Sequence, residues 1–113
     1  MAIDEAAFRR KVEAALKGLL RQLDGVDPSG EELDIKYSDG VLQIDFEVGG
    51  TFILSQQVPV QELWLSAQRR AWHFQIQESG WVERDNGEPL VAVLSTLFSQ
   101  KLGRTVALKA PAT

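Results

Sequence analysis

The sequence predicts an α+β fold, a two-layer sandwich in which two terminal helices pack on one face of a five- to seven-stranded antiparallel sheet. Apolar residues recur at intervals of three and four near both ends of the chain, as in amphipathic helices. Between them, apolar and polar residues alternate in short runs separated by turn-forming residues, which is typical of antiparallel strands. The 113 residues suit a single domain spanning 1–113, with one sheet face left uncovered.

The first helix is predicted between Asp4 and Asp24, where six apolar residues share one stripe. The stripe consists of Phe8, Val12, Leu16, Leu19, Leu20 and Leu23. Asp4 and Glu5 lie where negative charge suits the helix dipole, and Gly25 is placed to end the helix. The outward face is basic on balance and carries Arg9, Arg10, Glu13, Lys17 and Arg21.

An acidic segment follows the first helix, around a turn predicted at Pro28, Ser29 and Gly30. Its acidic residues are Asp24, Asp27, Glu31, Glu32 and Asp34. Carboxylate oxygens are the ligands that hard cations and oxygen-loving iron accept, with weak affinity on an open surface. The segment is therefore a candidate metal site, and a solvated patch that only aids solubility is the alternative.

A hairpin is predicted from residues 33–37 and 41–47, because Asp39 and Gly40 favour a two-residue turn between alternating strands. This register pairs Tyr37 with Leu42, Ile35 with Ile44 and Leu33 with Phe46, so the apolar partners share one face. On the other face Asp34 lies opposite Asp45, and Lys36 lies opposite Gln43. The pair of carboxylates is a candidate cation site, unless Lys36 and solvent satisfy both acids.

The next turn is predicted to be a three-residue loop at 48–50, because a two-residue loop would slip the hydrophobic face. This loop sets Phe46 opposite Phe52 and Ile44 opposite Leu54. The side chains expected on the exposed face are Ile53, Ser55 and Gln57. Pro59 then interrupts the ladder, because proline has no amide to donate.

Two further strands are predicted at 62–66 and 72–76, and they place Trp64 on the exposed face. Leu63 and Leu65 face the core, whereas Glu62, Trp64 and Ser66 join the side of Ser55 and Gln57. His73 and Gln75 also turn outward. A tryptophan amid polar side chains resembles the centre of a protein-binding surface. The alternative is that neighbouring side chains cover Trp64.

The remaining elements are a short strand at 81–83 and a second helix with Pro89 in its first turn. The apolar stripe of this helix consists of Leu90, Leu94, Leu97, Phe98 and Leu102. Gly103 is placed to end the helix. Residues 105–108 could add a last strand or an extended tail packed on the helices.

Composition excludes several function classes. A net charge of −4 disfavours binding to a nucleic-acid backbone, and the absence of cysteine excludes disulfides and thiolate metal sites. No apolar run approaches the roughly 20 residues of a membrane span, and the first residues do not resemble a targeting segment. We therefore expect no nucleic-acid or membrane partner and a cytoplasmic location. The sequence has no nucleophile motif and no cysteine that its single histidine, His73, could activate, so an enzyme is not expected.

Several motifs together resemble the frataxin family, in its small bacterial CyaY type. They are Gly50-Thr51-Phe52, Pro59, Trp64-Leu65-Ser66, Trp72-His73-Phe74, Trp81 and the terminal helix. The resemblance runs from Phe8 to about Leu108, nearly the whole chain. It implies a frataxin-like fold and a role in iron-sulfur cluster assembly, as an iron-binding regulator or iron chaperone.

The resemblance also implies partners and site residues. Weak iron binding would use the acidic ridge that runs from the end of the first helix into the first strand, and docking would engage a cysteine desulfurase and an iron-sulfur scaffold protein. The residues expected at the partner surface are Ser55, Gln57, Glu62, Trp64 and His73, and those expected at the metal are Asp24, Asp27, Glu31, Glu32, Asp34 and Asp45. Leu20, Arg21 and Gln22 replace acids that are frequent in the family, so we expect weaker iron binding.

Two alternative functions stay open from the sequence. One is an iron store or weak ferroxidase, and the other is a small acidic chaperone that presents its sheet to a different client. We expect a monomer by default, with metal-driven assembly as an alternative.

Overall fold

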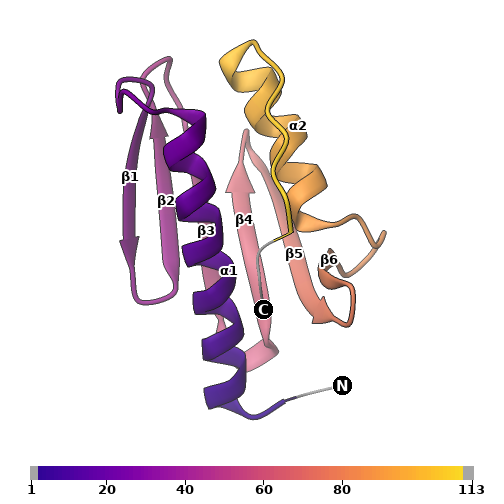
Figure 1. Ribbon diagram of the computed structural model, residues 1–113. Coiled ribbons are helices and arrows are strands. Elements are labelled where there is room, and N and C mark those ends of the chain that lie inside the picture. The colour runs from indigo at the N-terminus through magenta and orange to yellow at the C-terminus, as the bar shows by residue number, and fades with distance from the viewer. Residues whose placement is uncertain (1–2, 111–113) are drawn as a thin grey trace.

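The computed structural model describes residues 3–110, and it shows two helices lying on the same face of one antiparallel sheet (Figure 1). Helix α1 spans Glu5–Val26 and helix α2 spans Leu90–Leu102. The strands are β1 (Leu33–Ser38), β2 (Val41–Phe46), β3 (Thr51–Gln57), β4 (Glu62–Ala67), β5 (Arg70–Gln77) and β6 (Gly80–Glu83). Each strand pairs with its neighbour in sequence, in the order β1-β2-β3-β4-β5-β6. The predicted two-layer α+β fold is confirmed.

Helix α1 begins close to its predicted start, and the Asp4 carboxylate caps it by accepting a hydrogen bond from the Ala7 amide at 2.7 Å. The predicted stop at Gly25 is wrong. The helix continues through Gly25 to Val26, and Asp27 forms the C-cap with its amide bonded to the Leu23 carbonyl. Glycine permits a helix end but does not impose one.

The first hairpin has the predicted register, with Tyr37 opposite Leu42, Ile35 opposite Ile44 and Asp34 opposite Asp45. The predicted register of the second hairpin is wrong by two residues. Phe52 pairs with Ile44 instead of Phe46, because the turn lies one residue earlier than predicted: the Phe46 amide bonds to the Gly50 carbonyl at 3.0 Å. A shift of two keeps every side chain on its predicted face.

The core lies between the sheet and the helices, and three phenylalanines fill one end of it. Phe46 and Phe52 come from adjacent strands, with ring centroids 4.6 Å apart. Phe98 from α2 meets both edge-on, at 5.4 and 5.5 Å. Such edge-to-face contacts add to the stabilisation from apolar burial.

Residues 104–110 form an extended segment that runs beside α2 towards α1, which is the predicted tail rather than a strand (Figure 1). Val106 and Leu108 are buried. Ser99 of α2 both donates to the Val106 carbonyl and accepts from its amide. The Gln22 side chain makes the same two kinds of bond with Lys109. This segment joins the two helices over the core.

Pro89 lies at the N-cap of α2, one residue before the first turn in which it was predicted.

Candidate functional site: the open sheet face and the acidic segment

The sheet face opposite the helices is organised in cross-strand rows. Ser55, Trp64 and His73 are successive partners across β3, β4 and β5. Gln57, Glu62 and Gln75 form the next row. Register thus confirms that the residues predicted for this face share it. Their predicted exposure is only partly correct, because Ser55, Gln57, Trp64 and His73 are all half-buried.

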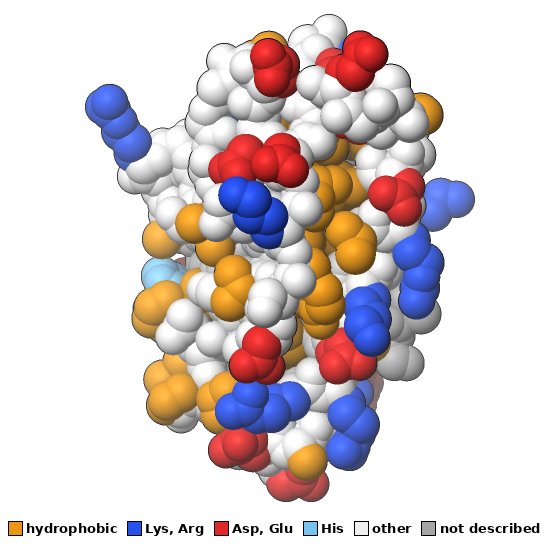
Figure 2. All heavy atoms as spheres, turned by 90° about the vertical axis from the view of Figure 1, so that its left-hand side faces the viewer, with side chains coloured by type: hydrophobic (Ala, Val, Ile, Leu, Met, Phe, Trp, Pro, Cys, Tyr) orange, Lys and Arg blue, Asp and Glu red, His pale blue; other side chains and the backbone are white. Residues whose placement is uncertain are grey.

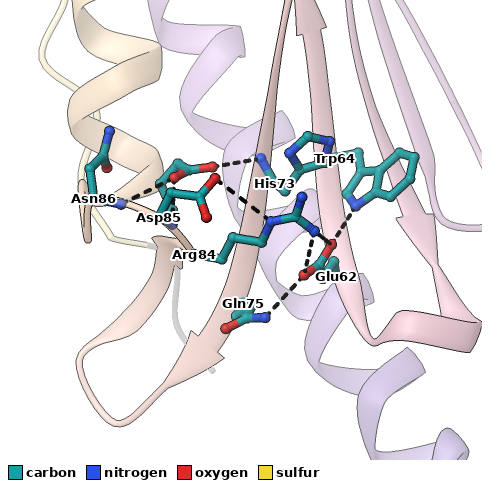
Figure 3. A network of polar contacts seen from close by, with 8 residues as sticks. Glu62, Trp64, His73, Gln75, Arg84, Asp85 and Asn86 are labelled. Atoms are coloured by element: carbon teal, nitrogen blue, oxygen red, sulfur yellow. Dashed lines mark hydrogen bonds and ion pairs between the residues drawn. The ribbon is translucent and has the colours of Figure 1, made fainter.

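Trp64 is held on this face by two neighbours (Figure 3). The His73 ring lies 4.7 Å from the indole and at 83° to it, an edge-to-face contact. The indole Nε1 donates to a carboxylate oxygen of Glu62 at 2.8 Å. The ring is therefore fixed in place and remains partly exposed to a partner.

Glu62 was predicted to be exposed at the partner surface, and this prediction is wrong, because the residue is only 3% exposed. Its carboxylate also accepts hydrogen bonds from Gln75 at 3.0 Å and from Arg84 at 3.1 and 3.3 Å. Burial alone would raise the pKa of Glu62, but the bonds from Trp64, Gln75 and Arg84 outweigh it and hold the pKa below its usual value. Glu62 is a charged, fully bonded group beneath the surface.

Glu83 is a buried acid that the sequence pattern does not single out. It accepts hydrogen bonds from the amides of Asp85 at 2.7 Å, Asn86 at 3.3 Å and His73 at 3.1 Å. Burial acts to raise the pKa of Glu83, and these amides reverse the effect and lower it. The turn at 85–87 directly after the strand was the available signal, since carboxylates often satisfy turn amides. Glu83 fixes the loop that carries Arg84.

Asp27, predicted as a metal ligand, has a structural role in the acidic segment instead. It is 8% exposed, and its carboxylate accepts from the amides of Leu33 at 2.9 Å and Glu32 at 3.0 Å. Burial acts to raise its pKa, but the amides of Leu33 and Glu32 and the Ser29 hydroxyl outweigh it, so the pKa lies below its usual value. A carboxylate so occupied is a poor ligand for a metal.

The Asp27→Asn variant is expected to be less stable at neutral pH, because both backbone amides bond to Oδ2 of Asp27 and an uncharged amide oxygen accepts such bonds more weakly than a carboxylate does. The pKa of Asp27 is lower in the folded protein than its value near 3.8 in the unfolded chain, so the ionised carboxylate stabilises the fold at pH values above 3.8. This stabilisation is lost as the pH falls through the pKa of the folded state. The gap in melting temperature between wild type and variant should therefore be widest above about pH 5 and close in stronger acid. Asp24→Asn, which changes an exposed neighbour, is the matched control and should show no such gap. A gap that is constant with pH would contradict the assignment.

The other predicted ligands do not converge. Glu32 forms a bidentate salt bridge with Arg104, with both N–O distances at 2.8 Å. Arg104 also donates to the Val26 carbonyl at the end of α1. Asp45 accepts from Thr51 at 2.6 Å and from Gln43, and Lys36 lies 3.7 Å away. These bonds, led by those from Thr51 and Gln43, lower the pKa of Asp45.

Three exposed carboxylates are left on the acidic segment: Asp24, Glu31 and Asp34. Among residues 3–110, no three acidic or histidine side chains come together in a way that could hold a metal ion. Figure 2 shows acidic side chains dispersed over this side of the molecule, with basic side chains among them. The donor set suits at most shallow, weak cation contacts.

A shallow hollow of about 400 Å³ lies beside the open face, next to the row of Gln57, Glu62 and Gln75, and residues 58–61 and 75–77 line it.

No helix within residues 3–110 has the length and apolar character needed to cross a bilayer. What the geometry offers is therefore a contoured surface centred on an aromatic ring.

Two helices on one face of a six-stranded antiparallel sheet, with the opposite face open around a tryptophan, define a frataxin-like protein. The family model described as the frataxin-like domain matches residues 1–104. The chain belongs to the frataxin family, and its curated relatives place it with the bacterial CyaY type.

Two of these relatives are the iron-sulfur cluster assembly proteins CyaY of Cupriavidus metallidurans and Paraburkholderia phymatum. The first is 32% identical over 108 residues, which cover 95% of this chain and 97% of that protein. The second is 30% identical over 104 residues, which cover 92% of this chain and 96% of that protein. The similarity therefore extends over nearly the whole length of both relatives.

Solved structures share the fold at lower sequence identity. Frataxin from Psychromonas ingrahamii matches with a TM-score of 0.76 and 19% identity, over 93% of this chain and 97% of that one. Trimeric frataxin from the yeast Saccharomyces cerevisiae, complexed with ferrous iron, matches with a TM-score of 0.72 and 21% identity, over 92% of this chain and 90% of that one. At such identities the similarity concerns the fold alone.

Proposed function

We propose that this protein takes part in iron-sulfur cluster assembly in the cytoplasm, docking through its open sheet face on a complex of cysteine desulfurase and scaffold protein. The observation that carries the proposal is the row of Ser55, Trp64 and His73 across the open face. The printed names of the bacterial relatives support the pathway. In this role the protein regulates a partner and carries out no reaction of its own.

The open face has the composition of a protein-binding surface. A half-buried aromatic ring lies at its centre, with hydroxyl, carboxamide and imidazole groups around it. Interfaces of this kind derive most of their affinity from a central aromatic residue and use the polar surround to exclude water. The carboxylates of Asp24, Glu31 and Asp34 would add attraction to a basic partner surface and speed its approach.

The direct test is a binding measurement between the full chain and a purified cysteine desulfurase, with and without the scaffold protein. We expect saturable binding that weakens as salt rises, because the exposed carboxylates contribute to the encounter. Thr96→Ala, an exposed change on α2, is the control and should bind as the wild type does. The absence of saturable binding in both mixtures would overturn the proposal.

Iron enters this proposal as a weakly held cargo. With Asp27, Glu32 and Asp45 bonded within the protein, Asp24, Glu31 and Asp34 are the proposed contacts, and dissociation constants of roughly 10⁻⁴ M or weaker are expected for such open oxygen sites. This arrangement disfavours an iron store or a ferroxidase, which would need carboxylates gathered around the metal.

Anaerobic titration with ferrous iron tests the cargo assignment. The double variant Asp24→Asn/Asp34→Asn is expected to lose most of the weak binding, because it removes two exposed ligands. Asp27→Asn is expected to retain it, because that carboxylate is bonded to backbone amides. Several tightly bound iron atoms, undiminished in the double variant, would contradict the assignment.

A further inference from the structure

The single hydrogen-bond donor of the Trp64 side chain is already used within the protein. Indole carries one donor and no acceptor. That donor, Nε1, bonds to Oε1 of Glu62 at 2.8 Å, two residues earlier on the same strand and the same face. The part of the ring that stays accessible is therefore apolar.

The carboxylate that receives this bond is itself held by two other elements. Gln75 of β5 donates to Oε2 at 3.0 Å. Arg84, from the loop after β6, reaches both oxygens at 3.1 and 3.3 Å. Figure 3 shows Gln75, Arg84 and the Trp64 indole around the Glu62 carboxylate, each pointing towards it. With both oxygens engaged from three directions, the carboxylate has little freedom to rotate.

We propose that Glu62 is a positioning residue for docking: it holds the Trp64 ring and occupies its donor, so that the partner meets Trp64 only through apolar ring surface. The chemistry that fits this surface is an aliphatic or proline side chain, rather than a carbonyl or carboxylate that would seek the indole N–H. The inference rests on the proposed docking function for the partner, and on the structure alone for the positioning.

The burial of Glu62 distinguishes positioning from direct contact. Glu62 is 3% exposed, whereas the Arg84 side chain that covers it is 41% exposed. A partner approaching the face would meet the indole, the guanidinium and the imidazole before it reached the carboxylate. The effect of Glu62 on docking must therefore pass through the side chains that it bonds to, and the proposal assigns that effect to Trp64.

The first experiment uses the isolated protein and needs no partner. The indole N–H signals of the three tryptophans are recorded by nitrogen-15 NMR, and Trp64→Phe identifies the Trp64 signal by its loss. In Glu62→Gln this signal is expected to shift and to exchange with solvent about tenfold faster, because a bond to a charged acceptor is replaced by a weaker one.

Asp27→Asn is the matched control, since it makes the same carboxylate-to-amide change in a buried acid whose bonds go to Ser29, Glu32 and Leu33 rather than to the neighbours of Trp64. Both variants should lose stability, yet only Glu62→Gln should disturb the Trp64 signal. An undisturbed Trp64 signal in Glu62→Gln, or an equal disturbance in Asp27→Asn, would overturn the positioning role.

The second experiment measures docking on the cysteine desulfurase in a double-mutant cycle. Glu62→Gln is expected to weaken docking about tenfold in the wild-type background and less than about twofold in Trp64→Ala, because the effect acts through the ring. Equal weakening in both backgrounds would show that Glu62 acts on docking without Trp64, for example through Arg84, and would overturn the proposal. Trp64→Phe should weaken docking far less than Trp64→Ala, and equal losses would show that the partner needs the indole N–H. If the wild type does not dock, the proposed function fails while the NMR result still decides the positioning.

Discussion

Trp64→Ala is expected to weaken docking on a cysteine desulfurase about 100-fold. Central aromatic residues of interfaces commonly contribute about 2–4 kcal/mol, and each 1.4 kcal/mol changes the dissociation constant tenfold. Trp64 is the aromatic residue at the centre of its row, with Ser55 and His73 on either side. The measurement is the dissociation constant from equilibrium binding of the full chain to the immobilised desulfurase.

The control for this experiment is the fold of the variant itself. The Trp64 ring lies outside the core, so its loss should change the thermal unfolding midpoint only modestly compared with a core change. Wild-type affinity in a folded Trp64→Ala protein would remove the open sheet face from the docking proposal.

Phe98→Ala is expected to lower the free energy of unfolding by about 3–5 kcal/mol, the range for removing a buried phenylalanine ring. Phe98 is 1% exposed and contacts Phe46 and Phe52 across the interface between α2 and the sheet. Truncation would open a cavity that strands and helix together cannot close. Urea denaturation monitored by tryptophan fluorescence measures the loss through the midpoint and slope.

Phe98→Leu is the matched control, because it keeps an apolar side chain in the same site and should lose much less stability than the alanine variant. A loss below about 1 kcal/mol in Phe98→Ala would mean that the helix relaxes into the space. In that case the three-ring cluster would not be what fixes α2 on the sheet.

Local pattern was sufficient to predict the elements and most of the faces. The register of β1 and β2 follows from a two-residue turn at Asp39 and Gly40 and from the need to align apolar residues. The same reasoning was wrong by two residues for β2 and β3. There Gly49 and Gly50 both take positive φ, and two registers that differ by two residues give the same faces.

Whether a carboxylate is accessible depends on long-range hydrogen bonds, which the local sequence pattern does not reveal. Period-two alternation places Glu62 beside Trp64, but its burial depends on Arg84, 22 residues later in the chain. Asp27 is likewise removed from the metal ligands by the amides of Leu33 and Glu32, which approach only because the turn folds back. Charge and spacing identify a carboxylate, whereas its availability depends on these tertiary contacts.

The sequential strand order of the sheet has a consequence for folding kinetics. Every strand pairs with its chain neighbour, so each hairpin can form by closing a short loop. The packing of the helices depends on contacts between distant parts of the chain, because the bonds between Gln22 and Lys109 join residues 87 positions apart. Because distant contacts form late and slow the reaction, the rate-limiting step should be the docking of the two helices, with strand pairing already complete.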